Sequence, residues 1–242
     1  MCTSYEEFLA KINDFATVIS DASIDQLANE DWVTTQVGTV GLWFESRTHP
    51  DMPNLNIYGD DAVYMNKLER VGLWQVPRQL AQYLIRVKDC DIHHFLDVGT
   101  CSGATVTVIA IYLLRFGLLS VQTIDVCSLM DTRLIEKWNE LRLPIEYTLM
   151  SPSAKFTDVM KRSNYDIVFI DGNHEFEYVW DDYNRAKDIS RWLTFHDIND
   201  VFCAGVVQTW STIKNSGKYS DIFEFTYHSH GLRLMGIGLL QL

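Results

Sequence analysis

Asp171 and His174 have the side chains needed to activate a hydroxyl group. The apolar run 167–170 is followed directly by Asp171, and His174 comes three residues later. A carboxylate can hold a cation, and an imidazole can take up a proton near neutral pH. In the simpler alternative, Asp171 caps the next helix and His174 packs as a structural ring. Hydroxyl activation requires that the surrounding elements bring this pair to a ligand.

Helix and strand patterns alternate from residue 77 to the end of the chain. The expected strands are 94–99, 121–126, 145–150, 165–170, 191–198, 222–227 and 232–242, and the expected helices are 77–87, 103–116, 132–141, 178–189 and 204–214. Such alternation predicts an α/β fold, with a mostly parallel sheet and helices on both of its faces. In such a sheet, ligands bind beyond the carboxyl ends of the strands, so the residues at these ends are the candidates for function.

The first 71 residues have a different pattern. Ser4 can cap a helix, and one face of that helix is apolar, formed by Phe8, Leu9, Ile12, Phe15 and Ile19. A turn-rich segment, 47–61, follows it. We therefore expect one domain over 1–242, in which 1–71 form a helical N-terminal cap or lid and 72–242 form the α/β core.

Composition excludes several classes of protein. The 242 residues are 47% hydrophobic, which allows a sizeable core. With 32 acidic and 20 basic side chains the net charge is −12, and without a basic run no nucleic-acid partner is expected. The five cysteines form no CxxC pair, which favours free thiols and a cytoplasmic protein. No signal pattern or apolar stretch predicts a membrane span.

The first two expected core strands end in residues suited to a nucleotide-like ligand. Asp97, Gly99 and Gly103 stand where the backbone must turn tightly into a helix N-terminus. Cys101 replaces the second glycine of a dinucleotide fingerprint, which disfavours a nicotinamide dehydrogenase. Asp125, at the end of the next strand, can accept hydrogen bonds from both hydroxyls of a ribose.

These motifs together resemble the class I S-adenosylmethionine-dependent methyltransferases. The segments that carry the resemblance are 95–106 (FLDVGTCSGATV), 123–126 (TIDV), 150–156 (MSPSAKF), 165–183 and 193–214. Asp-Gly-x-His followed by His-Asp is similar to the sugar O-methyltransferases, among them the macrolide-sugar enzymes, and to the cephalosporin-hydroxylase-like group. The resemblance covers about 72–215, and it implies a Rossmann-like, doubly wound, seven-stranded sheet whose last strand is antiparallel.

The resemblance also implies how S-adenosylmethionine would bind. The residues implied for the methionine end are Asp97, Gly99, Thr100, Gly103 and Thr105, with Asp125 at the ribose and Ser153 and Ala154 at the adenine. Gln75 stands where relatives place a residue near the mouth of the site.

In the sugar-methylating relatives a divalent metal and a base act together. The resemblance implies that Asp171 binds the metal with two residues after the next strand, which match His196 and Asp197, and that His174 is the base. A base or a cation is needed because a sugar hydroxyl has a pKa far above 7.

His196 departs from the acid that the relatives have at this position. An imidazole favours Mn²⁺ or another transition ion over Mg²⁺, unless it does not bind the metal. In that case Asn199 or Asp200 could supply a replacement oxygen.

The expected function is O-methylation of a sugar or glycan acceptor, with S-adenosylmethionine and a divalent metal (Mn²⁺ or Mg²⁺). A deoxyhexose such as rhamnose is the acceptor suggested by the family. The alternatives are a catechol-type small-molecule O-methyltransferase, which would not need the histidine base, and a protein that binds S-adenosylmethionine without catalysis. Self-association into a homo-oligomer is compatible with the sequence.

Overall fold

The computed structural model describes residues 4–43, 48–49, 52–56, 59–66, 68, 70–127, 129–229, 231 and 233–242. For 48–49 and 52–56 only the backbone is described. The turn-rich segment 47–61 and the expected cap 1–71 therefore lie partly outside the described residues.

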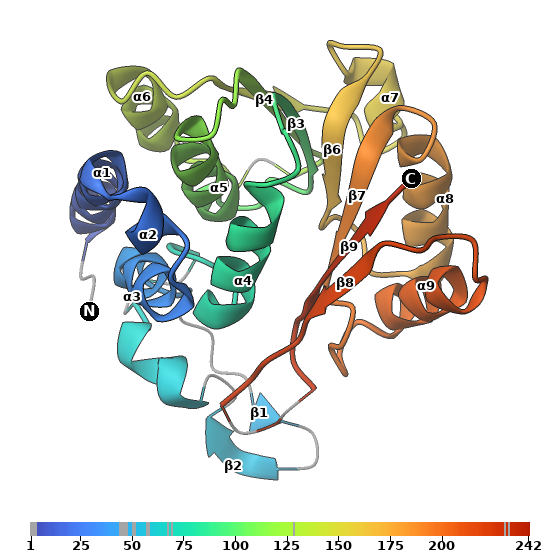
Figure 1. Cartoon of the computed structure of the whole chain (residues 1–242), viewed down its shortest axis with the longest axis horizontal. Helices are drawn as coiled ribbons and strands as arrows, with labels where there is room; N and C mark the ends of the chain where they lie inside the picture. Colours follow the sequence, from blue (N-terminus) through green and yellow to red (C-terminus); the bar gives the residue numbers. More distant parts are fainter. Residues whose placement is uncertain are drawn as a thin grey trace.

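A seven-stranded sheet forms the centre of the molecule (Figure 1). Its strands are β3 (His94–Val98), β4 (Ser120–Asp125), β5 (Ile145–Leu149), β6 (Tyr165–Ile170), β7 (Ser190–His196), β8 (Ile222–Phe225) and β9 (Ile237–Gln241). The spatial order is β5-β4-β3-β6-β7-β9-β8, and β9 runs antiparallel to the other six strands. The predicted mostly parallel sheet with an antiparallel last strand is confirmed. The chain order reverses between β3 and β6, which is where such sheets bind their ligands.

Helices cover both faces of the sheet. On one side lie α4 (Pro77–Val87), α5 (Ala104–Leu114) and α6 (Thr132–Glu140), and on the other lie α7 (Phe156–Val159), α8 (Phe176–Ala186) and α9 (Ala204–Asn215) (Figure 1). In the described part of the chain, no helix combines the length and apolarity needed to cross a membrane.

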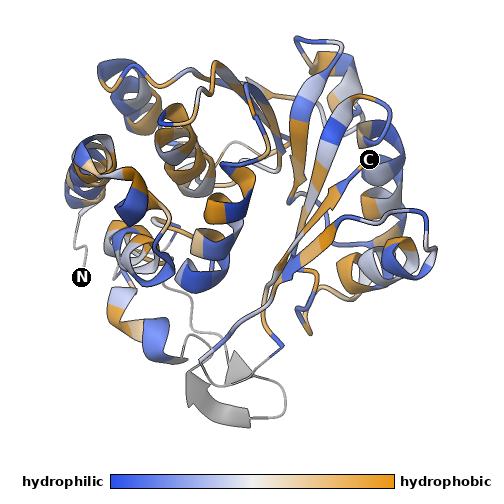
Figure 2. Ribbon diagram, viewed as in Figure 1, coloured by the Kyte–Doolittle hydropathy of each residue, from blue (hydrophilic) through white to orange (hydrophobic). Residues whose placement is uncertain are grey.

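The sheet separates two hydrophobic cores. Successive residues of β6 point to opposite faces, so Ile167 and Phe169 belong to one core while Val168 and Ile170 belong to the other. Figure 2 shows apolar residues along the strands and on the helix surfaces that face them. Burial on both faces explains why β6 is a continuous apolar run that ends abruptly at Asp171.

The N-terminal part adds helices outside α4 and α5. Its elements are α1 (Tyr5–Asp21), α2 (Ile24–Leu27), α3 (Glu30–Val40), the short strands β1 (Thr48–His49) and β2 (Met52–Asn56), and the 3-10 helix η1 (Gly59–Tyr64). The predicted cap of α1 is confirmed, because the Ser4 hydroxyl accepts a hydrogen bond from the Glu7 backbone N–H at 3.1 Å. Four of the five residues expected on its apolar face are buried, and Leu9 is partly buried.

Side chains of α5 hold these N-terminal helices in place. The Tyr112 hydroxyl donates to the Leu27 carbonyl at 2.6 Å, and Arg115 donates to the Ile19 carbonyl at 2.5 Å. The helices α1–α3 thus rest on the outer surface of the core. That this segment acts as a cap or lid remains a prediction.

The expected strand 232–242 is shorter than predicted and begins at Ile237. The preceding backbone is bonded to side chains instead of a neighbouring strand: Met235 N–H donates to Asp200, and Gly236 N–H donates to Gln79, each at 2.9 Å. Both residues have positive φ, which turns the chain away from extended geometry. The helices α2, α3 and α7 were not predicted.

Candidate active site

The loops after β3 and β6 touch each other at the reversal point of the sheet. Gly99 has φ of +111°, and a Cβ there would lie 2.1 Å from the Asp171 carbonyl oxygen. The Asp171 N–H donates to the Val98 carbonyl at 2.8 Å, which fixes the contact. Only glycine fits this position. The loop of residues 99–103, called the glycine loop below, therefore lies directly against the loop that carries Asp171 and His174.

The glycine loop ends at the N-terminus of α5. Gly103 is the N-cap residue, with φ of +81°, and Cys101 also has positive φ. The Ser102 hydroxyl donates to the Gly72 carbonyl at 3.3 Å, which ties the loop to the segment before α4. Thr105, in the first turn of α5, is partly exposed. Free N–H groups at such a helix start favour a negatively charged ligand group.

Asp97 and Thr100 are joined by Thr123 inside the sheet. The Thr123 hydroxyl donates to the Asp97 carboxylate at 2.5 Å, and the Thr100 and Thr123 hydroxyl oxygens are 2.6 Å apart. All three residues are buried. Burial raises the pKa of Asp97 well above its ordinary value, and the Thr123 hydrogen bond opposes this only in part. The Thr100 side chain is therefore engaged within the protein.

Asp125 braces the glycine loop from the next strand. One of its oxygens accepts from the Cys101 N–H and the other from the Cys127 N–H, each at 2.7 Å. Each carboxylate oxygen retains a second lone pair, so the group can still accept ligand hydroxyls. Ser153 and Ala154 follow β5, and the Ser153 side chain is exposed, with its oxygen 3.0 Å from that of Ser151.

Three expected metal ligands form a compact cluster, in which His196 and Asp197 are buried and Asp171 is partly buried. The His196 Nδ1 lies 3.1 Å from Asp171 Oδ1 and 3.1 Å from Asp197 Oδ1. Donor atoms of all three residues lie within 4.8 Å of one another, as a shared ion would require. Within the described residues, His196 Nε2 and Asp197 Oδ1 are buried without a well-formed hydrogen bond.

The three groups of the cluster shift one another's pKa values. Burial disfavours a charged imidazole, but the carboxylates of Asp171 and Asp197 outweigh it and raise the pKa of His196 well above its ordinary value. Burial also raises the pKa of Asp171, against the opposing charge of His196. For Asp197, burial is outweighed by His196 and by the hydrogen bond from His174, which keep its pKa far below the ordinary value.

His174 stands at the exposed edge of this cluster. Its Nε2 lies 3.2 Å from Asp197 Oδ2, and its side chain is 45% exposed whereas that of Asp197 is 5% exposed. The hydrogen bond to Asp197 raises the pKa of His174, and burial opposes it. A buried carboxylate therefore orients an accessible imidazole, as in an Asp–His pair of a general base.

Asp171 does not cap the following helix. In the turn before α8, the Asn173 side chain accepts the Glu175 N–H at 2.8 Å, and the carboxylate of Asp171 points to His196 instead. The simpler alternative for Asp171 is therefore wrong. His174 is exposed, so it is not a ring packed into the core.

Two residues of the site were not predicted, because neither of them stands at the end of an expected strand. Thr123 lies inside β4, and Cys203 lies at the start of α9, where its Sγ donates to Asp197 Oδ2 at 3.4 Å. A Cβ on Gly205 would lie 2.3 Å from the Phe176 nitrogen, so only glycine lets the start of α9 approach the 174–176 loop this closely. The spacing of six residues after Asp197 was the available signal.

The other candidate oxygen donors are engaged elsewhere. Asp200 accepts the Phe202 and Met235 N–H groups at 2.8 and 2.9 Å, and Asn199 accepts from Arg233 at 3.3 Å. Gln75 is fully buried, and neither atom of its amide has a hydrogen-bond partner in the described chain.

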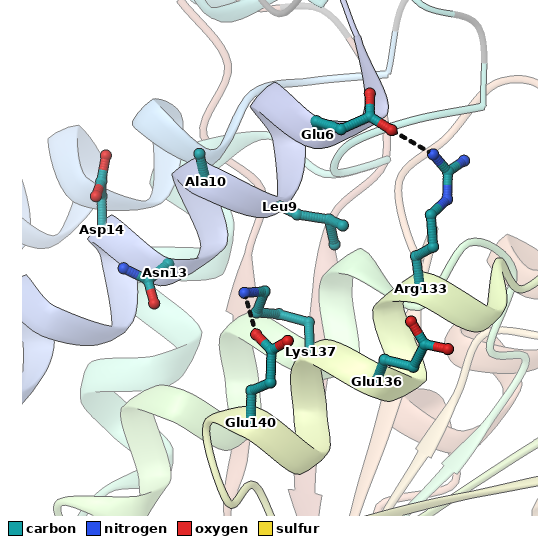
Figure 3. A pocket seen from close by; sticks show the side chains of 9 residues that line it. All are labelled: Glu6, Leu9, Ala10, Asn13, Asp14, Arg133, Glu136, Lys137 and Glu140. Atoms are coloured by element: carbon teal, nitrogen blue, oxygen red, sulfur yellow. Dashed lines mark hydrogen bonds and ion pairs between the residues drawn. The ribbon is translucent and has the colours of Figure 1, made fainter.

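A groove of about 600 Å³ lies between α1 and α6, apart from the strand ends. Figure 3 shows that its charged side chains are largely paired: Glu6 with Arg133, at 2.7 Å, and Lys137 with Glu140. None of the expected site residues lines it.

Comparisons with solved structures support the fold. Cofactor-bound Rv0187 from MTB matches with a TM-score of 0.52 and 15% identity, over 72% of this chain and 83% of that chain. The N-terminal domain of human METTL16 in complex with SAH (S-adenosylhomocysteine) matches with a TM-score of 0.51 and 12% identity, over 70% and 72%. A METTL16 MTase domain matches with a TM-score of 0.51 and 14% identity, over 69% and 68%.

No protein-family model matches the chain, and no curated protein matches it. The structural likenesses show that the chain shares the Rossmann-like fold of these proteins.

Proposed function

We propose that this protein is an S-adenosylmethionine-dependent O-methyltransferase that methylates a sugar hydroxyl in a glycan or a glycosylated small molecule. The observation that carries the proposal is the His174–Asp197 pair, an exposed imidazole held by a buried carboxylate at 3.2 Å. His174 lies on the loop that touches the glycine loop through Gly99. Methyl donor and base would therefore meet at the reversal point of the sheet.

The cofactor would lie across the carboxyl ends of β3, β4 and β5. The backbone N–H groups at the start of α5, near Gly103, would bind the methionine carboxylate, and Asp125 would accept hydrogen bonds from the ribose hydroxyls. Ser153 and Ala154 would line the adenine. The buried, unpartnered amide of Gln75 supports a ligand near the Gly72–Ser102 contact, since such groups are normally hydrogen-bonded.

His174 would act as the general base. Its Nε2–H donates to Asp197, which leaves Nδ1 to accept the proton of the acceptor hydroxyl. The deprotonated oxygen would then be free to attack the methyl group that bound S-adenosylmethionine supplies, with neutral SAH as the second product. Asp197 stays ionised and stabilises the imidazolium that forms.

Asp171, His196 and Asp197 fit a divalent ion that accepts nitrogen as well as oxygen ligands. The buried Asp197 Oδ1, which lacks a good hydrogen bond among the described residues, is available to such an ion. An imidazole in the set favours Mn²⁺ over Mg²⁺. When bound, the ion would supply positive charge that stabilises the developing alkoxide.

Exposed aromatic side chains support a sugar acceptor. Tyr178, Phe202 and Tyr227 are 54%, 42% and 48% exposed, and they follow β6, β7 and β8 respectively. Aromatic rings at this edge can pack on the C–H face of a sugar, and most readily on a deoxyhexose such as rhamnose, with its additional methyl group. Trp74, in contrast, packs edge-on against Trp43, with ring centroids 4.7 Å apart.

The test is methyl transfer by purified protein, measured as SAH release with a panel of deoxyhexose glycosides. His174→Ala should lower kcat by about 10² to 10⁴, the usual contribution of a positioned base. His93→Ala is the matched control, because that imidazole is 42% exposed but lies at the opposite end of β3.

Near-parent kcat in His174→Ala would contradict the role of base and favour the catechol-type alternative. Absence of SAH release with every acceptor, despite SAH binding, would favour a protein that binds the cofactor without catalysis.

A further inference from the structure

We propose a second metal position, formed by His174, Asp197 and Cys203, that takes a thiophilic divalent ion such as Zn²⁺ and thereby inhibits the enzyme. The inhibitory part rests on the proposed function, because the ion would capture the general base. The position differs from the oxygen-rich cluster of Asp171 and His196, with which it shares only the Asp197 carboxylate.

The three donor atoms already stand at metal-ligand spacing. His174 Nε2 and Cys203 Sγ lie 3.2 and 3.4 Å from the same oxygen, Asp197 Oδ2, and all three atoms are within 4.8 Å of one another. Zinc bonds of about 2.0–2.3 Å in a tetrahedron separate adjacent ligands by roughly 3.3–3.8 Å. Small side-chain shifts would therefore suffice to enclose an ion.

The two oxygens of Asp197 face different partners. Oδ1 lies beside His196, whereas Oδ2 accepts hydrogen bonds from His174 and Cys203. A thiol, an imidazole and a carboxylate form a donor set typical of Zn²⁺. The Cys203 thiol donates to the carboxylate and not to an imidazole, which is not the arrangement of a cysteine nucleophile.

The position is rigid on one side and open on the other. Gly205 packs against the backbone of His174 and Phe176, which holds the start of α9 on the loop that carries the base. The His174 side chain is 45% exposed, so an ion can enter from solvent and keep a water as its fourth ligand.

Metal binding would disable the base through a shift of its proton. Coordination by Nε2 moves the ring proton of neutral His174 to Nδ1, the nitrogen that would otherwise accept the substrate proton. Cys203 binds as thiolate, so one proton per ion is released to solvent. The ion is a reversible inhibitor, and no bond to the substrate is involved.

The test uses the purified 242-residue protein, treated with chelator and then titrated with Co²⁺ as a spectroscopic probe for Zn²⁺. The parent protein should develop a sulfur-to-cobalt charge-transfer band in the near ultraviolet, and Zn²⁺ should displace it. Cys203→Ser and Cys203→Ala should both lack the band. Cys127→Ser, which removes an exposed thiol, and Cys90→Ser, which removes a buried one, should keep it.

The functional arm compares methyl transfer with and without Zn²⁺ within each variant. Zn²⁺ should inhibit the parent at least tenfold more strongly than Cys203→Ser. No band in the parent, or an unchanged band in both Cys203 variants, would overturn the proposal. SAH binding, measured separately by calorimetry, distinguishes the two ideas: a cobalt band without SAH binding would refute the proposed function and leave the metal position standing.

Discussion

Gly205→Ala should separate the base from the carboxylate that orients it. The added Cβ would lie 2.3 Å from the Phe176 nitrogen and 2.4 Å from the His174 carbonyl oxygen. The start of α9 and the 174–176 loop must therefore move apart by at least about 0.7 Å to reach a contact of 3.0 Å, which real Cβ atoms rarely undercut. Overpacking of this kind destabilises by about 1–3 kcal/mol, whereas replacing glycine by alanine in a helix stabilises by roughly 0.5–1 kcal/mol. The net expectation is a loss between about 0 and 2.5 kcal/mol, centred near about 1 kcal/mol.

Urea denaturation should report this loss as a lower midpoint with an unchanged slope. Because the shift displaces His174 from its 3.2 Å contact with Asp197, kcat should fall by up to about 10². Affinity for SAH, which involves other strand ends, should remain within a few-fold of the parent. Gly172→Ala is the control for stability, since its Cβ would meet nothing closer than 3.7 Å. Parent-like stability and kcat in Gly205→Ala would show that the close approach of α9 does not position the base.

Three further outcomes are expected. Burial raises the pKa of Asp97 in the folded state, so the parent loses stability as pH rises above about 4 through that pKa. In urea titrations, Asp97→Asn should therefore be more stable than the parent at neutral pH but not at pH 4. Equal gains in stability at both pH values would contradict this. The hydrogen bond that His174 donates to Asp197 raises the pKa of His174, so kcat should fall as pH drops through an apparent pKa above the ordinary value of about 6.5. Asp197→Asn should shift this limb to lower pH, and a profile flat down to pH 5 would contradict the base. EDTA should suppress turnover and Mn²⁺ should restore it, whereas full activity in chelator with no bound metal would exclude the ion.

The sheet was predictable because its strands are buried on both faces. The run 167–170 is apolar without alternation and ends directly at Asp171. The early helix was predictable from the cap at Ser4 and the period of its apolar face. The short helix α7 was not predictable, because four residues carry too little periodic signal.

The residues at the carboxyl ends of the strands were predicted as candidates for the site, but the residues that contact them were not. Asp171, His196 and Asp197 meet because β6 and β7 are adjacent parallel strands. The closeness of Cys203 was signalled only by its spacing of six residues from Asp197, because it depends on how the start of α9 packs, where only glycine fits at 205. Likewise, the hydroxyl of Thr100 faces Thr123 in the neighbouring strand, a long-range contact that spacing in the sequence does not specify.

Calorimetric titration of the purified protein with SAH tests the central claim, that this fold binds a methyl donor at the ends of β3, β4 and β5. The account predicts saturable binding of one SAH per chain, with a dissociation constant below about 1 mM. Asp125→Asn should weaken it by about tenfold to a hundredfold, through loss of a charged acceptor worth about 1.5–3 kcal/mol. No heat of binding up to millimolar SAH, or an affinity unaffected in Asp125→Asn, would contradict the account.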